Sequence, residues 1–256
     1  MRRTFQTSLA VAALAAGPCW ADDPSPGPRF ETYIGADYDG RAASLVSNTV
    51  WGVFGPVTQP GFRLKLDGLA DVYGNSNAAV FSSSFMAADL KSVSDFMAGY
   101  QFQWGAAWIK LYAGAAFQVQ TRFFWSVGDT ANEQAIGAAA AIQSYWRVSD
   151  RVWASVNASW LQPDNATSLY SRAAYEIFRS DGGVKISAGF EASVSINNAD
   201  NFAEGKALYL YDNYSREGTL LNLRYGRNDL SLSGGISEAS GDVARPYATI
   251  SYGRQF

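Results

Sequence analysis

Residues 62–73, FRLKLDGLADVY, alternate between an apolar row and a charged row. The apolar row holds Phe62, Leu64, Leu66 and Val72. The other row holds Arg63, Lys65, Asp67 and Asp71. Successive side chains of a β-strand point to opposite faces, so a period of two predicts a strand with one apolar and one charged face.

The same alternation recurs along most of the chain and predicts twelve strands. They cover residues 30–39, 43–54, 62–73, 95–104, 109–122, 135–147, 151–161, 168–178, 184–197, 219–226, 229–237 and 246–256. Most exceed the ~5 to 6 residues common in soluble sheets and reach the ~9 to 11 that cross a bilayer at a tilt. Strand number and length therefore favour a membrane barrel over a secreted β-sandwich.

The connections between the predicted strands alternate between two kinds. The short or tight ones are FGPVTQPG, GAA, SDR, SDGG and RND. The longer ones are DGRAAS, GNSNAAVFSSSFMAADLKSVS, FFWSVGDTANEQ, LQPDNA, NNADNFAEGKALYLYDNYSRE and EASGDVA. Outer-membrane barrels have an even strand number, short periplasmic turns and longer outer loops. The sequence thus predicts an all-β fold, a transmembrane antiparallel β-barrel of about 12 strands in an up-and-down meander.

The N-terminal segment has the features of an export signal. Arg2 and Arg3 precede an apolar stretch, and small residues lie near a break after Ala21. We therefore expect a signal peptide at 1–21, a periplasmic lead at 22–29 and the barrel at 30–256, in the bacterial outer membrane. The one cysteine, Cys19, lies inside the signal peptide, so the mature chain is expected to have no disulfide framework.

Composition narrows the function classes. After residue 21 no apolar run approaches the ~20 residues of a spanning helix. Loss of Arg2 and Arg3 takes the net charge from −3 to −5 with no basic block, which argues against nucleic-acid binding. The chain has 0 histidines, which removes the commonest general base and metal ligand, and we expect no cofactor and no metal.

The polar rows of the strands would line the barrel interior. The candidate lumen charges include Arg63, Lys65, Asp67, Asp71, Lys110, Arg172, Glu176, Lys185 and Glu191. Charges inside a barrel must be paired or hydrated, so they could form mutual ion pairs that fill the interior. They could instead line a narrow pore of mixed charge, because twelve strands lie between the filled eight-stranded and the open sixteen-stranded barrels.

Aromatic side chains are expected on both faces. The candidate saccharide contacts in the lumen are Tyr33, Tyr73, Trp108, Tyr112, Tyr145, Trp153 and Tyr170. An aromatic ring beside hydrogen-bonding groups suits the apolar face and hydroxyl rim of a sugar, although such rings also pack against charged side chains. The outward aromatics Trp51, Trp104, Trp146, Trp160 and Tyr252 lie toward strand ends and suit interfacial girdles.

An enzyme in this scaffold would need paired carboxylates, such as Asp37 with Asp39 or Asp67 with Asp71. Spacings of two and four residues place these pairs about 6.6 and 13 Å apart along a strand, and the closer spacing is common by chance. We therefore expect no enzymatic activity and no catalytic residue.

Several segments resemble one known family. The final strand, YATISYGRQF, alternates and ends on an aromatic residue, as in chains that bacterial barrel-assembly machinery recognises. This ending, together with YIGADYDG, GYQFQWG, KLYAGAAF and WRVSDRVWASVNASW, is similar to the cellulose biosynthesis protein BcsS family of proteobacteria. The resemblance implies an exported or outer-membrane component of cellulose production and carries no catalytic motif.

The expected function is therefore an outer-membrane accessory in biosynthesis, secretion or surface anchoring of cellulose or a related exopolysaccharide. The alternatives are a general narrow porin for small solutes, and a plugged structural barrel whose loop ALYLYDNY at 207–214 binds polymer. The expected partners are outer-membrane lipid, cellulose or another β-glucan, and components of the cellulose synthase complex. Selective passage of β-linked glucans would separate the accessory from the porin.

Overall fold

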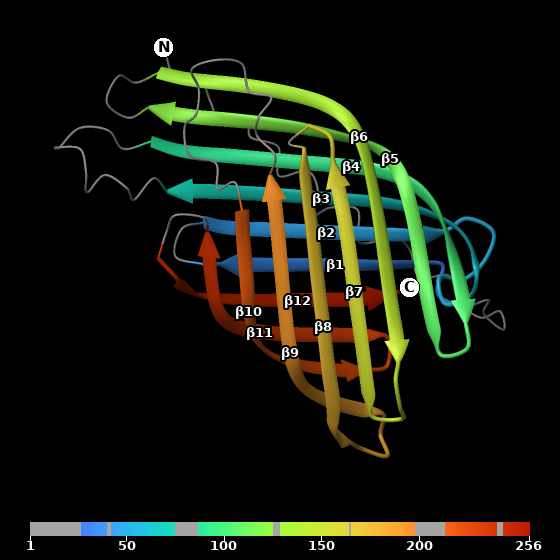
Figure 1. Cartoon of the computed structure of the whole chain (residues 1–256). Helices are drawn as coiled ribbons and strands as arrows, with labels where there is room; N and C mark the ends of the chain where they lie inside the picture. Colours follow the sequence, from blue (N-terminus) through green and yellow to red (C-terminus); the bar gives the residue numbers. More distant parts are fainter. Residues whose placement is uncertain are drawn as a thin grey trace, which may run out of the picture.

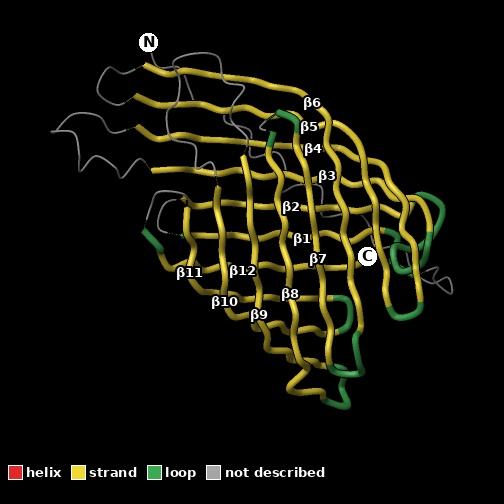
Figure 2. Tube along the Cα trace, viewed as in Figure 1, coloured by secondary structure: helices red, strands yellow, loops and turns green. Residues whose placement is uncertain are grey.

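A computed structural model describes residues 27–39, 42–74, 87–124, 129–163, 165–197, 213–239 and 243–256. All regular structure in these residues is strand, and none of them belongs to a helix that could cross a membrane. The strands are long and their connections mostly short, so the sheet accounts for most of the described chain (Figure 2).

The strands form one closed antiparallel barrel (Figure 1). They are β1 (Phe30–Tyr38), β2 (Ala42–Gly52), β3 (Gly61–Gly74), β4 (Ala87–Trp104), β5 (Ala107–Phe124), β6 (Asp129–Arg147), β7 (Val152–Leu161), β8 (Ala166–Arg179), β9 (Val184–Asn197), β10 (Asn213–Tyr225), β11 (Asn228–Ala239) and β12 (Arg245–Gln255). Each strand pairs with its neighbours in sequence, and β12 pairs with β1 to close the ring. The predicted fold class, strand number and meander order are confirmed.

Three strands begin at least six residues earlier than the alternation predicts. Strand β4 starts at Ala87 instead of residue 95, β6 at Asp129 instead of 135, and β10 at Asn213 instead of 219. The added parts lie at the end of the barrel that bears the longer loops. Ser92 and Ser94 occupy two neighbouring outward positions of the β4 extension, so the apolar outer row that marks a membrane strand is interrupted there.

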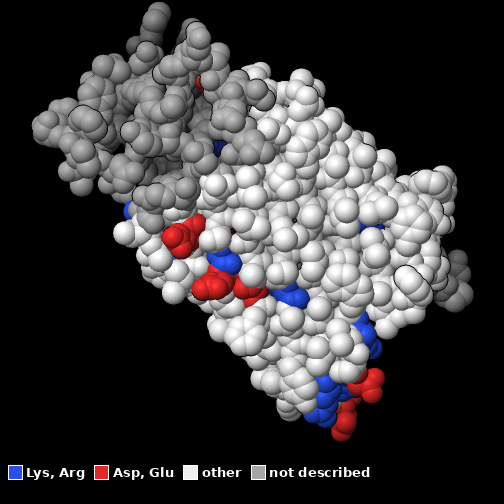
Figure 3. Space-filling view, in the orientation of Figure 1, with Lys and Arg blue, Asp and Glu red and all other residues white. Residues whose placement is uncertain are grey.

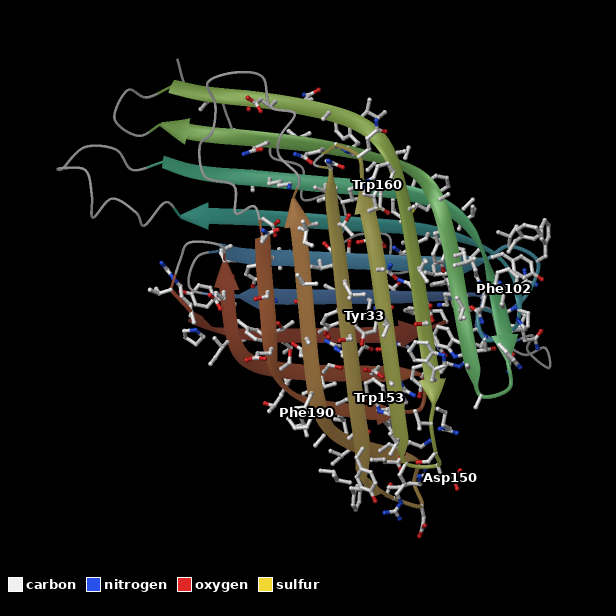
Figure 4. The ribbon with its side chains drawn as sticks, in the orientation of Figure 1. Tyr33, Phe102, Asp150, Trp153, Trp160 and Phe190 are labelled. Atoms are coloured by element: carbon white, nitrogen blue, oxygen red, sulfur yellow. The ribbon has the colours of Figure 1, made fainter. Side chains whose placement is uncertain are left out.

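The two rows of each strand occupy opposite faces, as the sequence predicts. Phe62 and Val72 on the outer face of β3 are 56% and 51% exposed, whereas Arg63 and Lys65 on its inner face are 1% and 3% exposed. Phe190 on the outer face of β9 is also exposed (Figure 4). An apolar exterior around a polar interior is the arrangement that a closed barrel requires in a bilayer.

The barrel has a turn end and a loop end. The turn end bears the connections 53–60, 105–106, 148–151, 180–183 and 226–227, and the loop end bears the other six. The described ends of the chain meet at the turn end, where the amide of Arg29 donates to the carbonyl of Phe256 at 2.6 Å and the Phe30 and Phe256 rings stack at 4.7 Å. The two kinds of connection are not strictly short and long, because 53–60 exceeds the three-residue connection at 39–41.

The predicted outer aromatics lie near strand ends. Trp51, Trp104, Trp146 and Tyr252 are close to the turn end, whereas Trp160 is at the loop end of β7 (Figure 4). A further aromatic group joins the first set, since the Phe62 and Tyr100 rings are 5.1 Å apart and the Tyr100 and Phe102 rings 4.8 Å apart. This concentration of rings suits a membrane interface near the turn end.

Candidate functional site in the barrel interior

The first group of interior charges lies on β1 to β5, toward the turn end. Lys65 forms an ion pair with Asp67, and the side-chain amide of Asn48 donates to the same carboxylate. Lys110 on β5 forms an ion pair with Glu31 on β1. Because β2, β3 and β4 separate these two strands in the ring, the Lys110–Glu31 pair spans part of the lumen.

Arg63 belongs to the barrel wall and not to an open lumen. Its guanidinium donates to the carbonyls of Phe62 at 2.8 Å, Pro56 at 3.0 Å and Gln59. It therefore ties the connection 53–60 to the inner face of β3. An arginine supplies several donors in a fixed geometry, which suits the capping of a cluster of carbonyls.

A second group lies toward the loop end, with Arg216 on β10 at its centre. The guanidinium forms an ion pair with Asp37 on β1, and its Cζ lies 5.0 Å from the Tyr214 ring centre and 4.9 Å from that of Tyr247. Thr249 also donates to Asp37, at 2.6 Å. The charge is thus held between two aromatic faces and a carboxylate, which are its two favourable environments in a partly dehydrated interior.

Glu191 on β9 connects this group to Tyr170 and Arg172 on β8. Its carboxylate accepts hydrogen bonds from Tyr247 on β12 at 2.9 Å and from Tyr170 on β8 at 2.7 Å, and Arg172 contributes an ion pair at 3.1 Å. Strands β9 and β12 are not adjacent in the ring, so the Tyr247–Glu191 contact also spans part of the lumen. Polar contacts between non-neighbouring strands therefore occur toward both ends of the interior.

The predicted saccharide contacts do not form one continuous track. Trp108, Tyr145 and Trp153 form a stack on β5 to β7, with ring centres 5.3 and 6.0 Å apart and planes within 23° and 21° of parallel. Lys110 Nζ lies 4.7 Å from the Trp108 ring centre. The ring faces in this stack largely meet one another, which leaves few free for a sugar.

Two other predicted contacts, Tyr33 and Tyr112, lie against the wall. Each ring covers the glycine directly opposite in register, Gly253 and Gly99 respectively, so that a Cβ at those positions would come 2.4 and 2.6 Å from the ring. The Tyr33 hydroxyl also donates to Asp229 at 3.3 Å. The side chain of Tyr73, another predicted saccharide contact, is not among those that the structure describes.

The turn end of β6 to β10 contains a half-open pocket. Its free space, including the part open to solvent, is ≈ 340 Å³. The lining includes Arg147, Arg151, Trp153, Lys185 and Arg224. Trp153 is labelled near this end in Figure 4.

Most of the predicted lumen charges form ion pairs or hydrogen bonds with other residues of the barrel. Glu176 pairs with Arg179 at 2.5 Å, and buried Asp71 lies opposite Lys91 in register. Both carboxylate pairs considered for catalysis are engaged, since Asp37 binds Arg216, Asp39 accepts from Tyr214 at 2.9 Å and Asp67 binds Lys65. In the described part of the chain, no cluster of three or more acidic, histidine or cysteine residues could hold a metal ion.

Sequence analysis missed Arg216 and Asp229, two of the best-connected interior residues. Asp229 accepts from Asn222 at 2.6 Å and pairs with Arg224 at 2.9 Å. Arg216 lies in the unpredicted part of β10. Extending the alternation from Leu220 back through Gly218 to Arg216 and Tyr214 would have placed it on the inner face.

The fold and the charged interior define a transmembrane β-barrel of the outer-membrane type. Two solved structures share this fold. The transport unit of the autotransporter AIDA-I from Escherichia coli has a TM-score of 0.51 and 12% identity, over 93% of each chain. The translocator domain of the autotransporter NalP from Neisseria meningitidis has a TM-score of 0.50 and 10% identity, over 91% of this chain and 90% of that one.

The family is given by the sequence. The model of the cellulose biosynthesis protein BcsS family matches residues 32–256, which is nearly the whole barrel. The chain therefore belongs to this family, and the resemblance stated from its strand motifs is confirmed. No curated protein matches the chain.

Proposed function

We propose that this barrel is an outer-membrane accessory of cellulose production that acts in secretion or surface anchoring of the polymer. The observation that carries the proposal is the combination of a family match over residues 32–256 with a closed membrane barrel. The general rule for such barrels puts the turn end in the periplasm. A signal peptide at 1–21, cleaved on export, would deliver the chain there; these residues lie outside the described part.

The interior contacts favour anchoring over free conduction. The Lys110–Glu31 and Arg216–Asp37 pairs join non-neighbouring strands toward the two ends of the lumen. Lys110 and Glu191 are 2% and 6% exposed, so little water reaches them. An extended polymer would have to displace these contacts, and separating a buried ion pair is costly. Polymer contacts at the loop end avoid that cost.

Conductance of the refolded mature barrel in a planar bilayer distinguishes surface anchoring of the polymer from its conduction through the lumen. Cello-oligosaccharides and malto-oligosaccharides of equal length are the paired probes. We expect little or no steady conductance under the anchoring version. Steady conductance blocked selectively by cello-oligosaccharides would instead favour a glucan conduit, and conductance with equal block by both would favour a general narrow porin.

A cellular experiment tests the link to cellulose. Deletion of the gene in a cellulose-producing host should lower the amount of cellulose that remains attached to the cells, and the wild-type gene should restore it. Replacing residues 207–212 with a Gly/Ser segment of equal length should reduce attachment if this loop, which lies outside the described residues, contacts polymer. Unchanged cell-bound and released cellulose in the deletion strain would refute the proposed function.

A non-enzymatic role is part of this proposal. Asp37, Asp39 and Asp67, which a carboxylate mechanism would use, are occupied by Arg216, Tyr214 and Lys65 in this structure. A general acid or base must reach its substrate, and these contacts compete with that access. Release of reducing ends from cellulose by the purified barrel would contradict this role.

A further inference from the structure

Three basic residues lie side by side at the turn end. Lys185 on β9 is directly opposite Arg179 on β8 and Arg224 on β10 in the strand register. Like charges in directly opposed positions destabilise a sheet unless something compensates them. An anion close to the row would therefore stabilise it.

Two members of the row have an anionic partner and the central one does not. Arg179 pairs with Glu176 at 2.5 Å, and Arg224 pairs with Asp229 at 2.9 Å. Within the described part of the chain, no carboxylate lies within ion-pair distance of Lys185. The same holds for Arg147 and Arg151, although Arg151 donates to the Tyr175 hydroxyl at 3.5 Å.

The half-open pocket at the turn end is lined by all three of these cations, Lys185, Arg147 and Arg151. Four basic residues line it, Arg147, Arg151, Lys185 and Arg224, against two acidic ones, Asp150 and Glu176. Charged side chains also gather at the lower end of the molecule in Figure 3, where the connections 148–151 and 180–183 lie. The local field therefore favours an anion.

The remaining lining adds a surface suited to a sugar ring. Tyr145 and Trp153 both line the pocket, and Trp153 is the end ring of the aromatic stack, so its outer face is the one that the stack leaves free. Ser187 and Asn222 add hydrogen-bonding groups on β9 and β10, and Trp153 Nε1 donates to the Ser187 hydroxyl at 3.4 Å. Aromatic rings bind the apolar face of a pyranose, and neighbouring polar groups bind its hydroxyls.

We propose that this pocket binds a saccharide that carries a negative charge, either a carboxylate or a phosphate. Lys185 and Arg147 bind the anionic group, and Trp153 contacts the ring. The proposal does not depend on the role in cellulose production, so the conductance and attachment experiments can fail while this site stands, and the reverse.

Calorimetric titration of the refolded mature barrel in detergent tests the site. Glucose 6-phosphate, glucuronate, glucose and inorganic phosphate are the four probes. We expect at least one anionic sugar to bind roughly ten-fold more tightly than glucose, and to weaken with added salt because the attraction is screened. The stronger of the two anionic sugars identifies the anionic group. Equal affinity for glucose and the stronger anionic sugar, or equal affinity for inorganic phosphate and that sugar, would overturn the proposal.

Variants separate the two parts of the site. Lys185→Gln should weaken binding of the anionic sugar by roughly ten-fold without lowering the melting temperature, because it removes a like-charge contact. Arg227→Gln is the matched control, since it removes an exposed charge from the same end outside the pocket. Trp153→Ala should weaken glucose 6-phosphate and leave inorganic phosphate unchanged. Equal binding by the Lys185 and Arg227 variants would refute the site.

Discussion

Lys110 on β5 and Glu31 on β1 form an ion pair between strands that three others separate in the ring. The Lys110 side chain is 3% exposed, whereas that of Glu31 is 24% exposed. The lysine therefore depends on this carboxylate more than the carboxylate depends on the lysine. Such a contact fixes the shape of the lumen as well as its charge.

Glu31→Gln should destabilise the barrel, because it leaves Lys110 buried without its anion. Removing one partner of a buried pair costs about 3 to 5 kcal/mol, and the partial exposure of Glu31 argues for the lower end of that range. Urea unfolding in lipid vesicles measures the change. A Glu31→Leu, Lys110→Met double variant should recover most of the loss, and a double variant as unstable as Glu31→Gln would contradict this account.

Arg216→Ala should widen the loop end of the lumen. The change removes the ion pair to Asp37 and the contacts of the guanidinium with the Tyr214 and Tyr247 rings. We expect single-channel conductance to rise above that of the wild type. Arg254→Ala is the control, because Arg254 lies on the outer face against Phe256. A rise in the control alone, or in neither variant, would show that Arg216 does not restrict the lumen.

Gly253→Ala should displace the Tyr33 ring. The new Cβ would lie 2.4 Å from ring carbon Cε2 of Tyr33, so the ring must rotate into the lumen or the strands must separate. Overpacking of this kind costs about 1 to 3 kcal/mol. Gly55→Ala is the matched control, since nothing lies within 4 Å of the corresponding Cβ. Equal unfolding free energies for the two variants would contradict the packing described.

Phe190→Arg should destabilise the barrel in a bilayer. Phe190 is 73% exposed on the outer face of β9 (Figure 4), so an arginine there would meet hydrocarbon. The cost is about 2 to 4 kcal/mol near the bilayer centre. Val148→Arg, in the exposed connection 148–151, should cost far less. Unfolding in lipid vesicles measures both, and similar losses would argue that β9 does not face lipid.

The alternation of side chains predicted the fold because one outer solvent, lipid, selects an apolar residue at every second position. The predicted strand bounds are least accurate where the outer face of the barrel no longer meets lipid. At the loop end of β4, Ser92 and Ser94 face outward, and at that of β10 Ser215 and Glu217 do so. Pairing of backbone groups continues there past these polar positions, so the apolar periodicity of the sequence ends before the strand does.

The sequence predicts which side chains face the interior, but it does not predict which of them contact one another. Alternation placed Lys110 among the lumen charges, yet nothing along the chain relates residue 110 to residue 31. Their contact depends on how far the register advances around the whole ring. The positions of Tyr33 and Tyr112 also depend on cross-strand register, because each ring covers the glycine that the neighbouring strand places opposite it.

The pairing of β1 with β12 means that the ring closes between the first and the last strand of the chain. Strand β1 is synthesised first, yet one of its two edges stays without its native partner until the twelfth strand arrives. An unpaired strand edge is a place where other chains can pair, so we expect a factor that shields this edge during transit to lower aggregation of the nascent protein. Moving the chain ends to the 226–227 turn would not shorten this delay, because β11 would then be made first and its neighbour β10 last. Every order of strands around a closed meander keeps one edge that waits for the final strand.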